Sequence, residues 1–218
     1  MRESAVPVAE LLPSSAERGR WAAALLVLSG AVFGLAAALM LVSWATSAPV
    51  ELDPLSGEPI TPLQAAFVGF ACLCLPVGVA TATSFLMWLY RAKRRQRWFG
   101  AETSPGWAVG VWFVPVVSLL LPYRQIRDLL VAEPVHPADR RPLLGLWWGL
   151  ILAATALGSA GVVLRGGLTG PGTHPAATRA LDFGSYALLA LAAFLAARFV
   201  SEFERRTARR ESAAPPPR

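Results

Sequence analysis

Side chains that could carry chemistry are few in this sequence. Its two histidines, His136 and His174, both lie between long apolar runs. Its two cysteines, Cys72 and Cys74, lie two residues apart, so on a helix they point to different faces. The sequence has no disulfide framework or zinc-binding spacing, and no His-Glu-x-x-His, Walker-type or nucleophile-elbow motif. We therefore expect no catalytic residue, no metal ligand and no cofactor.

Composition indicates what surrounds these residues. Hydrophobic residues make up 55% of the 218-residue chain and charged residues only 16%, against about a quarter in soluble domains. The mean hydropathy is +0.48, and the apolar residues fall in long uncharged runs, as in proteins that lie in hydrocarbon. We therefore predict an integral membrane protein. Among the 20 basic residues only Lys93 is a lysine, an arginine bias that suggests a GC-rich genome and a bacterial plasma membrane.

Four apolar runs are long enough to cross a bilayer: residues 21–44, 63–90, 143–164 and 183–200. They predict an all-α, polytopic transmembrane helical bundle of two hairpins. The first run is too long for the apolar core of a cleavable signal peptide, so we interpret it as an uncleaved span. The second run is followed at once by a cluster of positive charges, interpreted as a stop signal on the cytoplasmic side: Arg91, Lys93, Arg94, Arg95 and Arg97.

Residues 107–123 break this simple pattern. The segment holds Pro115 in its middle, and its 17 residues are at the lower limit for a span. If it does not cross, 18 of the 20 basic residues lie on one side and two on the other; if it crosses, the split is 10 to 10. The positive-inside rule thus favours four spans, with 107–123 re-entrant or buried. Residues 1–20, 91–142 and the basic tail 201–218, with a disordered end, are then cytoplasmic.

Residues 122–132 read as a short basic amphipathic helix, with Ile126, Leu129 and Leu130 on one face. Such a helix suits a membrane surface that contains anionic lipid. A solvated helix that packs on the bundle fits the pattern equally well. The net charge of +6 does not indicate nucleic-acid binding, because the arginines flank apolar runs and form no patch on a soluble face.

Several short motifs stand out in the middle of the chain: Trp88-Leu89-Tyr90-Arg91-Ala92, Ser104-Pro105-Gly106-Trp107-Ala108-Val109-Gly110, Trp112-Phe113-Val114-Pro115, Pro122-Tyr123 and Arg127-Asp128-Leu129. Together these motifs resemble the bacterial membrane proteins catalogued as domain-of-unknown-function family 4328. The later Leu146-Trp147-Trp148-Gly149-Leu150 is also similar, and the resemblance covers roughly residues 63–205. Members often carry Asn where Ser118 stands here, and a longer polar insertion after the Arg-Ala pair. The resemblance implies a multi-pass membrane protein and brings no activity or substrate.

The motif residues fit packing and anchoring. Ser104 is placed to cap a helix that starts at Pro105. Glycines four residues apart let helices approach closely, as expected for the pairs Gly30/Gly34, Gly106/Gly110 and Gly145/Gly149. On this account, Gly106→Leu or Gly110→Leu lowers the folded yield. Tryptophans at 98, 107 and 112, with Tyr123, suit the headgroup level.

Three functions remain open. The first is a non-enzymatic membrane protein that acts through helix packing with itself or with envelope partners, with anionic lipid at its cytoplasmic face. The second is a small transporter or pore, which is suggested by the break at Pro115. The first three runs contain no ionisable residue, although such residues are the usual sign of a transport pathway. The third is a lipid-modifying enzyme, which would have to use groups near the headgroups: His136, Asp128, Arg124 and Arg127.

Overall fold

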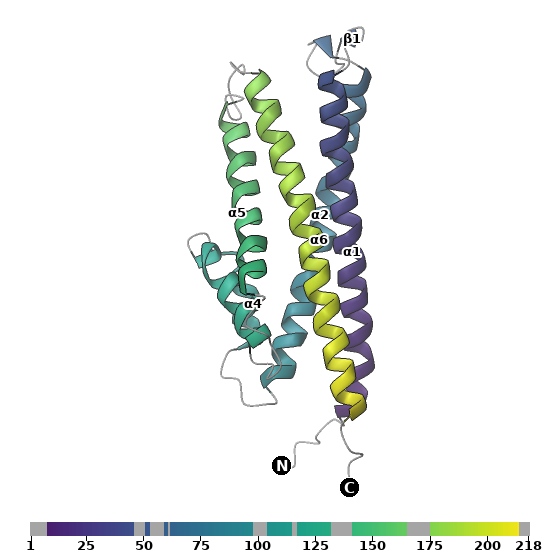
Figure 1. Ribbon diagram of the computed structural model, residues 1–218, viewed down its shortest axis with the longest axis vertical. Helices are drawn as coiled ribbons and strands as arrows, with labels where there is room; N and C mark the ends of the chain where they lie inside the picture. Colours follow the sequence, from purple (N-terminus) through teal and green to yellow (C-terminus); the bar gives the residue numbers. More distant parts are fainter. Residues whose placement is uncertain are drawn as a thin grey trace. The chain divides into compact units, whose positions relative to one another are not determined.

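The computed structural model describes residues 8–45, 51–52, 59–60, 62–97, 104–114, 117–131, 141–164 and 175–213. Pro115, His136, His174 and the end of the tail lie outside these residues. The elements, drawn in Figure 1, are α1 (Val8–Ala45), β1 (Glu51–Leu52), β2 (Pro59–Ile60), α2 (Pro62–Arg97), α3 (Pro105–Gly110), the 3-10 helix η1 (Val117–Leu119), α4 (Leu121–Val131), α5 (Arg141–Leu164) and α6 (Pro175–Ala213). The two short strands pair antiparallel, with Glu51 opposite Ile60.

Four helices are long and apolar enough to cross a membrane. The qualifying segments are Gly19–Ser43, Cys72–Arg94, Leu143–Leu164 and Ala177–Ala208. The prediction of an all-α fold with four membrane-length helices is therefore confirmed. The helices extend beyond the predicted spans: α1 already begins at Val8 and α6 continues to Ala213. The extension of α6 includes an i,i+4 ion pair, in which Arg206 donates to Glu202 over 2.6 Å.

Residues 107–123 do not form one helix. The six residues of α3 span about 9 Å, far short of the roughly 30 Å of a bilayer core. Tight turns follow, in which the N–H groups of Trp112 and Phe113 donate to the carbonyls of Val109 and Gly110. The 3-10 helix η1 and then α4 begin after them. This segment is thus a chain of short elements, as a non-crossing segment requires.

The chain divides into two compact units. The first comprises residues 1–26, 81–145 and 195–218, and the second residues 27–80 and 146–194. In the second unit α6 packs closely on α1 and on α5. A Cβ added at Gly30 would lie 3.0 Å from the ring of Phe194, and one at Gly184 would lie 3.0 Å from Leu157. The Ser185 hydroxyl donates to the carbonyl of Ala154 over 2.9 Å.

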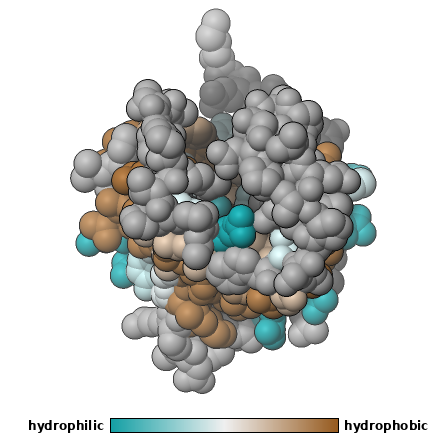
Figure 2. Space-filling view, turned by 90° about the horizontal axis from the view of Figure 1, so that it is seen from above, coloured by the Kyte–Doolittle hydropathy of each residue, from teal (hydrophilic) through white to brown (hydrophobic). Residues whose placement is uncertain are grey.

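Glycine therefore permits close helix contact where α1 meets α6, as expected for Gly30. Gly34, one turn later, is in ordinary contact distance of Ala190, at 3.8 Å. Outside such contacts, many large apolar side chains are exposed, including Leu75 and Val163. Figure 2 shows such apolar residues, in brown, on the outer surface of the helices. An exposed apolar surface of this extent fits a lipid environment.

Gly30→Leu is expected to destabilise the protein in detergent by about 1–3 kcal/mol, because the new side chain would overlap the ring of Phe194. The matched control is Gly110→Leu, since nothing lies within 4 Å of a Cβ at Gly110. The effect is measured by heating both variants and recording, at each temperature, how much monodisperse protein remains. Equal stability of the two variants would contradict this description of the helix contact.

Candidate functional site

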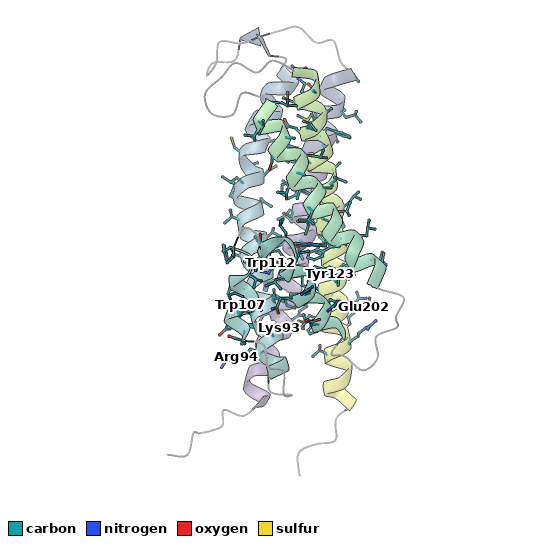
Figure 3. The ribbon with its side chains drawn as sticks, turned by 90° about the vertical axis from the view of Figure 1, so that its left-hand side faces the viewer. Lys93, Arg94, Trp107, Trp112, Tyr123 and Glu202 are labelled. Atoms are coloured by element: carbon teal, nitrogen blue, oxygen red, sulfur yellow. The ribbon has the colours of Figure 1, made fainter. Side chains whose placement is uncertain are left out.

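The described residues of the family-like motifs lie in the first unit, except residues 146–150, which belong to the second unit. Trp88, Arg91 and Ala92 belong to α2. The motif from Ser104 to Gly110 consists of α3 and its N-cap residue, Ser104. Trp112 and Phe113 lie in the turn after α3, whereas Pro122, Tyr123, Arg127 and Asp128 belong to α4. Figure 3 labels several side chains of this region, which gather around α3 and α4. The fold thus assembles short motifs that are separate in the sequence.

Aromatic rings connect these elements. The ring centroid of Phe85 lies 5.5 Å from that of Trp88 and 5.8 Å from that of Trp112. Phe203 of α6 packs edge-to-face on Trp88, at 5.6 Å. Such edge-to-face pairs add stability beyond area burial. The cluster attaches the turn after α3 to α2, and α2 to α6.

A partly buried hydrogen bond strengthens the same junction. The indole Nε1 of Trp88 donates to a carboxylate oxygen of Glu204 over 2.8 Å. The Glu204 side chain passes so close to Gly19 of α1 that a Cβ there would overlap it. Gly19 therefore lets three helices, α1, α2 and α6, meet around one carboxylate. The sequence does not predict this role, because Glu204 lies in the basic tail 201–218 and no spacing rule pairs it with a residue 116 positions away.

The environment of α3 differs from the expectation in two ways. Ser104 occupies the N-cap position and its carbonyl accepts from the N–H of Ala108, but its side chain makes no capping hydrogen bond. Around Gly110 a Cβ would meet nothing within 4 Å, and around Gly106 only the Ser104 hydroxyl, at 3.9 Å. The expected close packing at this glycine pair is therefore wrong. The lower folded yield expected for Gly106→Leu and Gly110→Leu, which depended on that packing, is therefore no longer expected.

One side of this segment is buried and the other is not. Ala108 and Val111 are fully buried, whereas Trp107 is half exposed and Phe113 is 73% exposed. An apolar segment cannot leave such side chains in water without cost. Of this segment, which was expected to be re-entrant or buried, only the inner side is covered by the described residues. Its outer side presents apolar groups as a lipid-facing element would.

The amphipathic character predicted for α4 is confirmed. Its inner face buries Pro122, Ile126 and Leu129, while Arg124 is exposed. Arg127 and Asp128 are exposed and form an ion pair of 3.2 Å. The side chain of Leu130 lies outside the described residues. The amphipathic pattern did not predict a polar residue on the inner face, yet Gln125 is buried there.

Lys93 is the main departure from the sequence interpretation. It was read as one of five charges that stop a span, which implies a side chain in water. Instead it continues the buried stripe of α2 at i,i+4 spacing, after Phe85 and Leu89, and is only 4% exposed. The carboxylate of Asp128 on α4 attracts its ammonium group electrostatically. A rule that counts charges near a span cannot distinguish such an inward-facing cation from an outward one.

Within the part of the chain that the structure describes, no group of three or more His, Cys, Asp or Glu side chains could hold a metal ion. The charged groups proposed for a lipid-modifying enzyme, Arg124, Arg127 and Asp128, lie on the exposed face of α4, and His136 is outside the described residues. The fold instead assembles a cluster of aromatic rings around Trp88, which is hydrogen-bonded to the Glu204 carboxylate. Lys93, on the same helix as Trp88, is a buried cation.

Trp88→Phe and Glu204→Ala are expected to destabilise the protein non-additively, because each removes the same hydrogen bond. A bond to a carboxylate contributes about 1.5–3 kcal/mol, and this is the coupling energy expected from the double-mutant cycle. Reversible unfolding in mixed micelles measures the four proteins of the cycle. Additive losses would show that the two side chains act separately.

Comparison with known proteins gives one family. The model of a family described as Domain of unknown function (DUF4328) matches residues 62–205, close to the range over which the motifs show their resemblance. No curated protein and no solved structure matches the chain. Because the matched residues are well over half of the sequence and include the α2, α3 and α4 motifs that meet in the first unit, the chain belongs to the DUF4328 family.

Proposed function

We propose that this protein is a non-enzymatic component of a bacterial plasma membrane that acts through helix contacts with a second copy of itself. One observation supports the proposal above the others. A face of α5 made of small residues is not covered by any other described part of the chain. A different envelope protein is the alternative occupant of that face.

The bare face is defined by Gly149, Ala153, Ala156 and Ala160, which recur every three or four residues along α5 and are all exposed. Nothing lies within 4 Å of a Cβ added at Gly149, nor at Gly145 one turn earlier in the same helix. Among the described residues, no other helix therefore packs closely on this glycine pair. By contrast, Gly30 is already covered by Phe194.

In a bilayer, a face of this kind favours association. Lipid tails are as apolar as leucine, so helices associate through close packing, and small residues let two backbones approach. A second α5 would supply a face of the same shape, as a two-fold symmetric contact requires. The small residues of α5 thus form an exposed row on which none of the other described helices packs.

The proposed orientation places both ends of the chain in the cytoplasm. It rests on the 18-to-2 split of basic residues and on the exposed Arg124 and Arg127 of α4. These arginines would attract anionic lipid at that surface. The half-exposed Trp107 and the exposed Phe113 would lie at or below the headgroups.

Gly149→Leu is expected to weaken dimerisation in liposomes at least tenfold, because a branched side chain keeps the two backbones apart. Energy transfer between donor- and acceptor-labelled copies, titrated against lipid, measures the dissociation constant. The matched control is Ala82→Leu, which adds comparable volume at an exposed site on α2 and should change the constant less than twofold.

A strictly monomeric wild-type protein would contradict self-association, and so would equal effects of the two substitutions. A photo-cross-linker at Ala156, used in cells, identifies the occupant directly. Cross-links between two copies support the proposal. Cross-links that join Ala156 only to a different protein would replace self-association by a heterologous complex.

A further inference from the structure

The segment formed by α3, the turn after it and η1 (residues 107–114 and 117–120) carries large apolar side chains on its outer side. Five of them are 40–73% exposed: Trp107, Phe113, Val114, Leu119 and Leu120. On the inner side Ala108 and Val111 are fully buried. Leaving so many large apolar groups in water is costly. The outer side therefore needs an apolar partner.

A ring contact shows how far along α2 this segment lies. The ring centroids of Trp112 and Phe85 are 5.8 Å apart. Arg91, the first charge after the apolar run of α2, follows Phe85 by six residues. At 1.5 Å per residue, Phe85 lies about 9 Å inside that charge, whereas half of a bilayer core is about 15 Å. The turn after α3 is therefore level with apolar residues of α2 but does not reach the midplane.

Figure 3 shows the same order along the long axis: Arg94 is labelled lowest, Trp107 above it, and Trp112 above both. The segment thus rises from the charged end of α2 toward its apolar part. The next element, α4, carries charges again, so the segment returns toward the same side.

The backbone of the turn meets the condition that hydrocarbon imposes. The N–H groups of Val111, Trp112 and Phe113 each donate to a carbonyl of α3, and the N–H of Ser118 donates to the carbonyl of Val114 over 2.7 Å. Irregular backbone is tolerated at membrane depth where its polar groups are paired and protein covers it. Here the inner side lies against the chain. The outer side therefore presents apolar side chains, and these N–H groups are already bonded.

The charges of α4 indicate where the apolar surroundings end. Arg124 and Arg127 are exposed, whereas the opposite face of α4 buries Ile126 and Leu129. Because the chain itself covers the apolar face of α4, this helix does not need acyl chains, and its arginines suit the phosphates of headgroups. The exposed apolar side chains thus stand directly before a basic margin, as in a segment that enters a leaflet from the headgroup side.

We propose that this segment enters one leaflet of the bilayer from the cytoplasmic side and that its outer side contacts the acyl chains of that leaflet. Acyl chains fit this side better than a protein does, because Met87 of α2, at nearly the same height as Phe85, is exposed as well. The inference rests on the membrane placement proposed above and adds to it a depth and an occupant. The segment then displaces lipid from one leaflet and not from the other.

Nitroxide labels on single cysteines test the proposal in the full-length protein, reconstituted into vesicles of phosphatidylethanolamine and phosphatidylglycerol. The cysteines replace Phe113 or Leu120 in a background that lacks Cys72 and Cys74. Collisions with molecular oxygen, which dissolves in hydrocarbon, and with a polar nickel chelate, which stays in water, report the surroundings of each label.

Two exposed positions of α2 calibrate the depth. Tyr90→Cys lies next to Arg91, and Ala82→Cys lies nine residues from Arg91, which is about 14 Å and close to the midplane. The matched control on α4 is Arg127→Cys, at an exposed charged position.

We expect the labels at Phe113 and Leu120 to collide severalfold more often with oxygen than with the chelate, and the label at Arg127 to show the reverse preference. The depth at Phe113 should lie between those at Tyr90 and Ala82. Leu120→Cys decides the matter if Phe113→Cys does not fold.

Chelate access at Phe113 equal to that at Arg127 would overturn the proposal. So would protection from both reagents, which would mean that a protein covers the segment, and so would a label deeper than that at Ala82. If the label at Ala82 also prefers the chelate, α2 is not in the bilayer and the membrane placement itself is wrong. If only the labels at Phe113 and Leu120 do, that placement stands and this inference alone fails.

Discussion

Hydrocarbon cannot hydrogen-bond a peptide group, and this constraint governs the whole architecture. Any segment that crosses must satisfy its N–H and C=O groups internally, so only long helices can cross. The four helices of sufficient length and apolarity meet that condition. Each described helix between residues 105 and 131 ends after at most 11 residues and is too short to cross a bilayer by itself. Their irregular turns require protein or headgroups around them.

The family motifs have a common explanation in this light. The rings of Trp112, Phe85 and Trp88 hold the turn after α3 against α2. Trp88 in turn bonds Glu204, which fits only because Gly19 has no side chain. These motifs therefore form a chain of contacts from the segment to α6 and α1. Lys93, which follows the first motif directly, is also buried.

The sequence predicted the fold well because the membrane signal is strong and local. Run lengths and charges predicted the four long helices. It could not predict which way a residue faces. Three glycine pairs of identical spacing have different surroundings: Gly30 touches Phe194, Gly110 faces open space, and Gly149 lies on a bare helix face. Spacing fixes a shared face of one helix, whereas the neighbour on that face depends on tertiary packing.

Side-specific cysteine labelling in intact cells tests the central claim. The claim is that residues 107–123 do not cross the membrane, so that the region after them and the C-terminal tail both lie in the cytoplasm. Single reporter cysteines replace Glu133 and Ser212 in a background that lacks Cys72 and Cys74. The account predicts that a membrane-impermeant reagent labels neither position until the cells are permeabilised. Labelling of both positions from outside would contradict it, because the broken segment would then have to cross and the basic tail would lie outside the cell.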